Sequence, residues 1–509
     1  MWRSRFFPSK IMTTGLIALL VVLTGACQKS VIEEPSMQIR DPFAVGSSTL
    51  FIHDQSRPYD SVAGVNTGIR TLVTEVWYPV NHDQIAAIAG KGETLRHATY
   101  GDYVFGSRAV HKLMMTQTTF FHLTPETVKA EVNIDQIEEA IDELFNRERA
   151  SYLDAPLADT GAAFAVVVMS HGDAGSRYNM ETVCEYLAAQ GYVVIAPEHT
   201  GNSPYTMTGS DPALSAMGGN SDFKSLMSDV LPLLNEEGAY GNTARFGQSY
   251  APGTGRDSPL EELLTLDRAL LERVNDLRAT LDELERMNLG GKFAARLDLK
   301  HIGLIGRSFG GATTLAALNM ESRFTAGVAV VPPAWADPRE TLPNDILIPA
   351  EQESVLLSVE GKFPLSTISK PTLLLVGEED RLIIGLSASM AKNSTAPMPG
   401  VDNPHPALRT AYTTTEAPVV WASLADSNHA TLGVSGAYWW PQLKTNLQTR
   451  YFKPKQTFTL INPVLAHSIQ KEKVLAFFDF TIRGQKTAFT RLIDQKYKSA
   501  GLSLEARNF

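Results

Sequence analysis

The chain has only two cysteines in 509 residues, too few for a disulfide framework. Its formal net charge of −10, with no long basic run and no interleaving of basic and aromatic residues, argues against a nucleic-acid-binding surface. Four early histidines lack metal-ligand spacing, so we predict no metal site among them: His82, His97, His111 and His122. What is present is ordinary for a globular protein, with 44% hydrophobic and 20% charged residues and ample material for a core.

Residues 1–26 have the features of a lipoprotein signal peptide. Basic residues up to Lys10 precede an apolar run, Ile11 to Leu23, that is too short to span a membrane comfortably. The following Thr-Gly-Ala-Cys27 resembles the end of a bacterial lipobox, in which the cysteine takes the lipid. An uncleaved anchor is the alternative. We expect a mature chain that begins at Cys27 and is anchored to the membrane through its acyl chains.

The residue after the lipidated cysteine, Gln28, is similar to those that direct sorting to the outer membrane. We therefore expect a cell-envelope protein that faces the periplasm or the outside. With Cys27 lipidated, Cys184 is the only other cysteine, and no intrachain disulfide is possible. Cys184 stands at helical spacing with Leu187, which favours a buried packing residue over a reactive thiol.

Continuous apolar runs alternate with helical patterns through the middle of the chain. Runs of this kind are typical of strands buried on both faces of a parallel sheet. The series predicts a doubly wound, mostly parallel α/β sheet. Its predicted members are strands at 164–169, 192–196, 302–305, 326–331, 371–376 and 419–422, with helices at 180–190, 266–287 and 473–483. Segments 48–53 and 69–79 alternate apolar with polar residues and predict antiparallel edge strands.

We predict one large domain with insertions rather than several domains. A polar tether covers 27–46, the domain covers 47–485, and a C-terminal tail covers 486–509. Insertions are expected at about 85–150, which reads as helical, at 205–265 and at 386–418. The 205–265 insertion is rich in Gly, Ser, Asn and Pro, is long for a plain connection, and is expected to form a cap or lid.

The strongest motif is Gly306-Arg-Ser-Phe-Gly310, which follows an apolar strand and precedes a helix of small residues. This is the G-x-S-x-G nucleophile elbow in its required strand–turn–helix setting. The glycines leave room for neighbouring backbone at a turn sharp enough to expose the hydroxyl of Ser308. The helix N-terminus points its unpaired N–H groups at the site. We predict Ser308 as a nucleophile; a glycine-rich turn in an ordinary α/β unit is the alternative.

A serine nucleophile needs a base and an orienting acid, which follow later strands in the order acid, then histidine. One predicted strand ends in Gly377-Glu-Glu-Asp380, and the last one leads into Asp426-Ser-Asn-His429. We predict Asp380 as the acid and His429 as the base.

Other residues compete for these roles. His405 stands in a Pro-rich loop and His467 precedes the closing helix, so neither follows a strand at a turn. Asp380 could instead be a loop-end carboxylate that pairs with Arg381.

Two backbone N–H groups are expected to form an oxyanion hole. One should come from Phe309, the residue after the serine, and the other from Asp173, in the His-Gly-Asp loop after the first buried strand. Gly172 permits the turn that aims the Asp173 N–H inward. We interpret His171 as a ring that buttresses this loop, with a catalytic base as the alternative.

These motifs resemble a known family. Ser170-His-Gly172, Gly191-Tyr-Val-Val-Ile-Ala-Pro-Glu-His199, the elbow, and Glu75-Val-Trp-Tyr-Pro79 are similar to the dienelactone-hydrolase-like group of α/β-hydrolases, with platelet-activating-factor acetylhydrolases and bacterial polyester hydrolases as relatives. The resemblance covers about 42–205 and 266–485. It implies the α/β-hydrolase fold and serine-based ester hydrolysis without cofactor or metal.

The chain departs from this family at two places. Acetylhydrolases carry their acid just after the strand that follows the elbow helix, where this chain has Val331-Pro-Pro-Ala-Trp335, with Asp337 only further on. That difference favours Asp380 but leaves Asp337 as an alternative. Dienelactone hydrolases use a cysteine nucleophile, whereas this elbow holds Ser308. We expect a carboxylic-ester hydrolase of unknown substrate; a lipase or phospholipase-A2-like acyl hydrolase, or a catalytically silent binding lipoprotein, are the alternatives.

Overall fold

The structure is a computed structural model. It describes residues 41–103, 134–203, 259–392, 396–433 and 447–509, except for 63–65, 67, 174, 336 and 341, and it also describes Lys112 and Met115. The signal peptide, Cys27 and nearly all of the expected lid at 205–265 lie outside the described residues. Among the helices in the described ranges, we find none that is long and apolar enough to cross a membrane.

One mixed sheet of eleven strands organises the described part of the chain. From edge to edge it contains β13 (Leu502–Arg507), β10 (Val419–Leu424), β9 (Thr372–Gly377), β8 (Phe324–Val330), β7 (Leu297–Arg307), β5 (Phe164–Ser170), β6 (Tyr192–Pro197), β2 (Arg70–Val80), β1 (Ala44–Asp54), β4 (Glu148–Leu153) and β3 (His97–Thr99). The six strands from β10 to β6 pair in parallel. Their carboxyl ends therefore meet at one edge, where such sheets place their sites.

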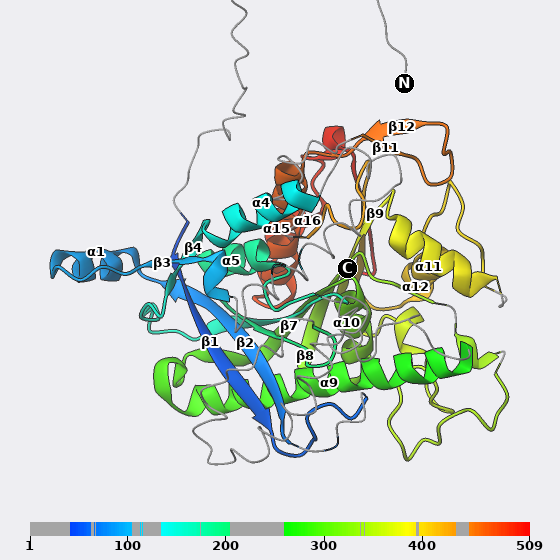
Figure 1. The fold of residues 1–509 in the computed structure, drawn as a ribbon, viewed down its shortest axis with the longest axis horizontal. Helices are drawn as coiled ribbons and strands as arrows, with labels where there is room; N and C mark the ends of the chain where they lie inside the picture. The colour runs from blue at the N-terminus through cyan, green and yellow to red at the C-terminus, as the bar shows by residue number, and fades with distance from the viewer. Residues whose placement is uncertain are drawn as a thin grey trace, which may run out of the picture. The chain divides into compact units, whose positions relative to one another are not determined.

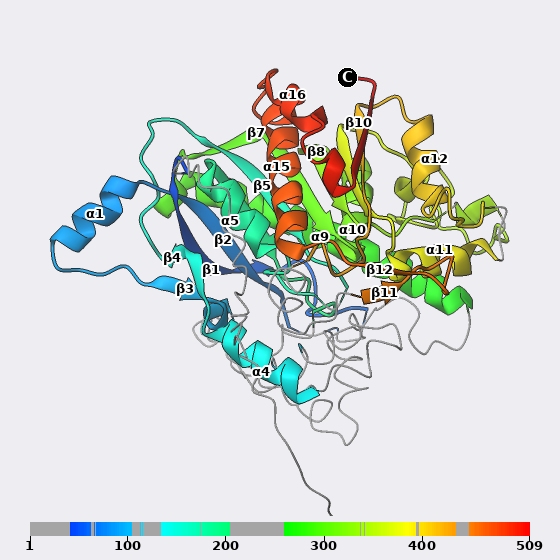
Figure 2. The ribbon, with the colours of Figure 1, turned by 90° about the horizontal axis from the view of Figure 1, so that it is seen from above.

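Helices cover both faces of this sheet (Figures 1 and 2). The α-helices of the described residues are α1 (His82–Gly90), α4 (Ile134–Phe145), α5 (Glu181–Ala189), α9 (Pro259–Leu289), α10 (Phe309–Met320), α11 (Arg381–Ala391), α12 (Pro406–Thr414), α15 (Pro463–Thr481) and α16 (Ala488–Ile493). Short 3-10 turns are η1 (Tyr100–Tyr103), η2 (Gly291–Phe293), η3 (Pro338–Glu340), η4 (Pro364–Ser366) and η5 (Lys498–Ala500). A separate hairpin pairs β11 (Leu447–Thr449) with β12 (Thr457–Thr459).

Two apolar cores lie on opposite faces of the sheet because successive strand residues point to opposite sides. In β5, Val167 and Met169 pack into the core shared with α5 and α15. Val166 and Val168 pack into the other core, shared with α9 and α10. The continuous apolar run of β5 is thus explained by burial on both faces, as predicted.

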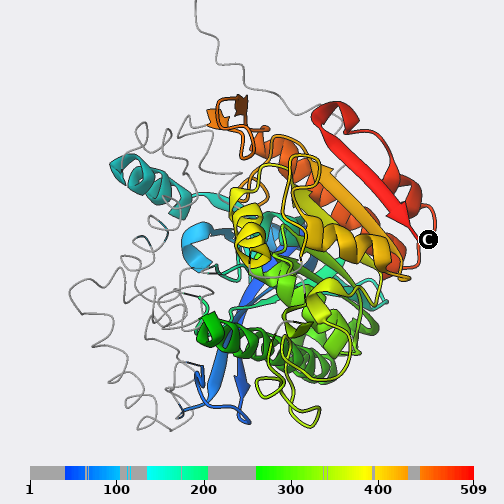
Figure 3. The same ribbon diagram turned by 90° about the vertical axis from the view of Figure 1, so that its right-hand side faces the viewer.

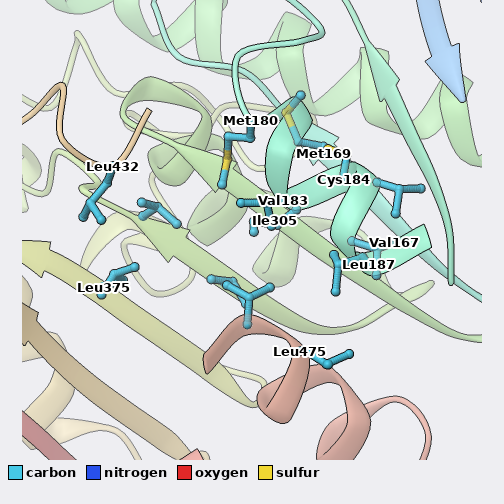
Figure 4. Packing of buried hydrophobic residues seen from close by; sticks show 14 of the residues in the cluster. Val167, Met169, Met180, Val183, Cys184, Leu187, Ile305, Leu375, Leu432 and Leu475 are labelled. Carbon is cyan, nitrogen blue, oxygen red and sulfur yellow. The ribbon is translucent and has the colours of Figure 1, made fainter. Parts of the chain in front are cut away.

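Cys184 lies in the first of these cores. Figure 4 shows it on α5, close to Met169 and Val167 of the strand beneath. The side chain is buried, and burial raises the pKa of its thiol well above the ordinary value. The prediction of a packing residue is confirmed, since a buried, protonated thiol is a poor nucleophile.

Both N-terminal segments predicted as antiparallel strands are antiparallel, but the prediction that they form an edge is wrong. β2 lies between β6 and β1 and is buried along its whole length. The alternation of apolar and polar residues in β2 suggests one solvent-facing side, but its polar side chains have partners inside the protein. Arg70, for example, binds Asp276 of α9.

The sheet also extends beyond the predicted boundaries. The 85–150 insertion, expected to be helical, contributes β3 and β4 as well as α4. At the other end, the segment expected to be a tail contains β13, which pairs antiparallel with β10. Figure 3 shows β13 in red at this edge of the sheet.

The start of α10 packs directly onto the end of β5, and Gly310 makes this approach possible. A Cβ on Gly310 would lie 2.1 Å from the Ser170 carbonyl oxygen and 2.6 Å from that of His171. We expect Gly310→Ala to lower the free energy of unfolding by about 1–3 kcal/mol, because backbone must move to accept the methyl group. Denaturant unfolding measures the change. Gly290→Ala is the control, since nothing lies within 4 Å of its Cβ position; equal stability of the two variants would contradict the expectation.

Candidate active site

Ser308 stands on a sharp turn between β7 and α10. Its backbone angles are φ 57° and ψ −124°, a region that non-glycine residues rarely adopt. Gly306 and Gly310 permit the turn: a Cβ on Gly306 would lie 2.1 Å from the Gly310 carbonyl oxygen. The structure therefore forms the elbow geometry that the motif predicts.

The structure brings Ser308, His429 and Asp380 together in one chain of hydrogen bonds. His429 Nε2 lies 2.9 Å from Ser308 Oγ, and His429 Nδ1 lies 2.7 Å from Asp380 Oδ2. The three residues follow β7, β10 and β9, whose carboxyl ends share one edge of the sheet. Asp380 uses its other oxygen, Oδ1, to accept the N–H of Ile383 and cap α11, which fixes the carboxylate.

The competing residues are engaged elsewhere. Asp337 forms an ion pair with Arg339 through both carboxylate oxygens. His405 places Nε2 2.9 Å from the Gly377 carbonyl oxygen, at the end of β9. His467 bridges Thr182 and the carbonyl of Gly433. Each of these side chains binds a group other than Ser308 or His429. The geometry therefore favours Asp380 as the acid and His429 as the base.

The loop after β5 lies against the elbow. A Cβ on Gly172 would be 3.1 Å from Ser308 Cβ and 3.2 Å from the Arg307 carbonyl oxygen, which is tighter than ordinary van der Waals contact. The carbonyl oxygen of Gly172 lies 2.7 Å from His171 Nδ1 and accepts the N–H of Gly175 at 3.1 Å. Since C=O and N–H of a trans peptide point in opposite directions, these contacts set the direction of the Asp173 N–H.

His171 acts on this loop as a buttress, which is the interpretation that the sequence favours. Its ring is fully buried, and Nε2 accepts the backbone N–H of His199 at 2.9 Å. Burial and the charge of Arg273 hold the pKa of His171 well below its usual value, so the ring is neutral. With Nε2 accepting, the proton sits on Nδ1 and is donated to the Gly172 carbonyl.

Two arginines at the site were not predicted to have a role: Arg307, inside the elbow motif, and Arg273, outside any motif. Arg307 is buried and donates from Nη2 to the carbonyl oxygen of His429. Arg273 of α9 donates to Ser170 Oγ and His171 O. A signal for Arg273 does exist: it stands three residues after Leu270 and four before Leu277, on the apolar face of a long helix. A charged residue on such a face needs buried partners.

Within the described ranges, we find no group of three or more His, Cys, Asp or Glu side chains arranged to hold a metal ion.

The family model described as "Platelet-activating factor acetylhydrolase, isoform II" matches residues 116–223 and 273–360. These segments contain Asp173, Ser308 and Phe309, but end before Asp380 and His429. Platelet-activating factor acetylhydrolase of Cavia porcellus is 27% identical over 191 residues, covering 37% of this chain and 40% of the relative. The protein of that name from Canis lupus familiaris is 28% identical over 239 residues, covering 46% and 48%. The matches thus span less than half of each relative's length.

Among solved structures, the ferulic acid esterase from Streptomyces cinnamoneus superposes with a TM-score of 0.50 at 18% identity, covering 93% of this chain and 98% of that one. This likeness shows the fold, and the predicted α/β-hydrolase architecture is confirmed. The predicted resemblance to platelet-activating-factor acetylhydrolases and related serine esterases is confirmed as well.

Proposed function

From an α/β-hydrolase fold with this similarity to serine esterases, we propose that the chain is a serine-dependent carboxylic-ester hydrolase that acts through an acyl-enzyme. The observation that carries the proposal is the unbroken hydrogen-bonded chain from Ser308 through His429 to Asp380 at the elbow. In this geometry one residue can attack, one can move a proton, and one can orient the proton carrier.

In the proposed mechanism, His429 Nε2 takes the proton of Ser308 Oγ as the oxygen attacks the ester carbonyl. The Asp380 carboxylate accepts a hydrogen bond from His429 Nδ1–H, which keeps Nε2 available as the base and stabilises the imidazolium that forms. The imidazolium then donates its proton to the leaving alcohol. Water attacks the acyl-enzyme as His429 Nε2 takes its proton, and the imidazolium returns that proton to Ser308 Oγ as the carboxylic acid is released.

The tetrahedral intermediate needs donors for its negative oxygen, and we assign the N–H groups of Phe309 and Asp173 to this role. As the first residue of α10, Phe309 has an N–H without an acceptor inside the helix. The positive end of the helix dipole adds to the stabilisation. Asp173 follows the Gly172 carbonyl that His171 holds, so its N–H is directed by the buttressed loop.

The pH dependence of the reaction should reflect the burial of His429. Burial, with the nearby Arg307 charge, lowers the pKa of His429 below its ordinary 6.5, although Asp380 opposes the shift. A histidine with a lowered pKa stays neutral, and so able to accept a proton, at more acidic pH. We expect the acid limb of a kcat/KM profile to lie below pH 6.5. A limb above that value would contradict the assignment of His429 as base.

A second candidate is acyl hydrolysis of lipids, of the lipase or phospholipase-A2 type. The names of the curated relatives favour it, since they are platelet-activating factor acetylhydrolases. Against close equivalence, the acid position expected in that family is occupied here by a proline-rich turn, and Asp337 is paired with Arg339. A catalytically silent binding protein remains the candidate from a different class.

We also propose that Cys27 carries a lipid that anchors the protein in the cell envelope, at the outer membrane. The support is the sequence alone: the basic n-region, the short apolar run and the lipobox-like end. Mass spectrometry of the mature N-terminus, with Cys27→Ala as control, tests this independently of catalysis.

Two measurements separate the candidates for function. A fluorophosphonate probe should label Ser308 covalently if the serine is an activated nucleophile, whereas a silent binding protein would stay unlabelled. A panel of chromogenic esters of increasing acyl length then ranks small esters against lipid-like ones. Absence of both labelling and hydrolysis would overturn the proposed function.

A further inference from the structure

The inference concerns Arg273 of α9, and it rests on the proposed function. Arg273 is fully buried. The helix that holds it, α9, runs along the face of the sheet beside α10 (Figure 1). Burying a guanidinium is costly unless its donors are satisfied, so the partners of Arg273 reveal what it holds in place.

One set of partners belongs to the loop that carries Asp173. Arg273 Nη2 donates to the carbonyl oxygen of His171 and, at 3.1 Å, to Ser170 Oγ. Arg273 Nη1 donates to Asn202 Oδ1. Asn202 in turn donates from Nδ2 to the carboxylate of Asp173 at 2.5 Å. Arg273 therefore binds the loop directly, through the His171 carbonyl, and indirectly, through Asn202 and the Asp173 side chain.

A further partner belongs to the elbow helix. Arg273 Nε donates to Thr313 Oγ1 at 2.9 Å, one turn after the start of α10. The guanidinium also stacks on the ring of Phe309, with its carbon 4.9 Å from the ring centroid. Thus the same side chain touches the residue that supplies the other oxyanion donor.

The charge of Arg273 also helps to keep His171 and its neighbour His199 neutral. The Oγ of Ser170 lies 2.9 Å from His199 Nε2, and His199 Nδ1 lies 3.0 Å from Asp276 Oδ2. Burial and the positive charge of Arg273 lower the pKa of His199 to about 3 and that of His171 well below the usual value, with Asp276 opposing. A neutral His171 can accept the His199 N–H and donate to Gly172.

We propose that Arg273 is a positioning residue of the oxyanion hole: it fixes the Asp173 loop and the Phe309 end of α10 relative to each other. The two donors lie on separate elements, one in the loop after β5 and one at the start of the helix after β7. These elements are far apart in the chain, so packing must hold them in place. An oxyanion hole works only when both N–H groups lie within hydrogen-bond distance of one developing charge. Arg273 spans the two elements with a rigid, planar set of donors.

Removal of the guanidinium tests this. Arg273→Met should lower kcat on a short-chain nitrophenyl ester by about 100-fold with KM changed little, as expected for misplaced transition-state donors. Arg273→Lys should recover only part of the rate, because an ammonium cannot reach both elements with a planar fork. Arg278→Met is the matched control: this arginine lies on the same helix but binds Glu353 and Met320, and it should behave as the parent.

A second readout distinguishes an oxyanion defect from general loosening. The parent should hydrolyse an ester faster than the thionoester of the same acid, because sulfur is a weaker acceptor for the two N–H groups. In Arg273→Met this preference should shrink, since the oxygen no longer meets both donors. An unchanged kcat, a change in KM alone, or an unchanged ester-to-thionoester ratio would each overturn the proposal.

If Arg273→Met does not fold, Thr313→Val replaces it as the milder test. This change removes the hydroxyl that accepts from Arg273 Nε and that donates to the Phe309 carbonyl, and we expect about a tenfold loss in kcat with a smaller ester preference. Parent-like kinetics of Thr313→Val would overturn the proposal. The outcomes also distinguish this inference from the proposed function. If the parent shows no Ser308-dependent hydrolysis, both the proposed function and the role of Arg273 are wrong. If the parent is active and the Arg273 variants behave like it, only the role of Arg273 is wrong.

Discussion

Ser308→Ala should abolish ester hydrolysis, with a loss of about 10⁶ in rate, while the fold and the thermal stability stay nearly unchanged. The size of the loss follows from the loss of the acyl-enzyme route. The proposed oxyanion donors and substrate binding would remain, but the serine oxygen that lies 2.9 Å from His429 Nε2 would be gone. The stability should survive because alanine keeps the Cβ and the turn is supported by Gly306 and Gly310.

The measurement is initial-rate hydrolysis of a chromogenic ester, with thermal unfolding of the same sample. Ser369→Ala is a suitable control, since Ser369 is exposed and its hydroxyl donates to the Leu318 carbonyl, away from the elbow. It should keep parental activity. If Ser308→Ala retained more than about a tenth of the rate, Ser308 would be removed from the nucleophile role.

Asp380→Asn should lower kcat by roughly 10⁴. The carboxylate oxygen Oδ2 accepts a hydrogen bond from His429 Nδ1–H, while Oδ1 accepts the N–H of Ile383 and caps α11. Asparagine can keep the cap with its carbonyl, but its amide then presents N–H groups to Nδ1. The histidine would be driven to the other tautomer, with the proton on Nε2, where it cannot accept the proton of Ser308.

The matched comparison is Asp337→Asn, which changes the carboxylate at the acetylhydrolase-type position. Because Asp337 is paired with Arg339, we expect little change in kcat, and both variants should be assayed on the same ester. A large loss for Asp337→Asn with a small one for Asp380→Asn would show that the acetylhydrolase arrangement operates in solution.

Much of the candidate site could be predicted from local sequence. The elbow around Ser308 needs glycines at fixed offsets and a strand and helix on either side, all within a short stretch of chain. The order Ser308, Asp380, His429 follows from strands whose ends are visible as apolar runs. The parallel centre of the sheet is similarly local, since burial on both faces leaves continuous apolar residues.

The helical prediction for 85–150 holds at α4 but is wrong at β3 and β4, and the edge assignment of β2 is wrong for the same reason. Local periodicity reports whether a side chain faces apolar surroundings, but it does not report which distant residue meets it. The polar residues of β2 read as solvent-facing, yet Arg70 finds Asp276 more than two hundred positions later and is buried with it. Pairing of β4 with β1 likewise depends on chain brought in from far along the sequence.

The sequence by itself therefore determined the doubly wound sheet, the elbow at Ser308 and the candidate acid and base. Only the tertiary structure shows that Asp380, rather than Asp337, is the carboxylate that reaches His429, because this contact depends on β9 lying between β8 and β10. Only the tertiary structure also brings Arg273 into contact with both the loop after β5 and α10. The physical reason is that hydrogen bonds act over about 3 Å, and only packing sets distances of that size between residues remote in the chain.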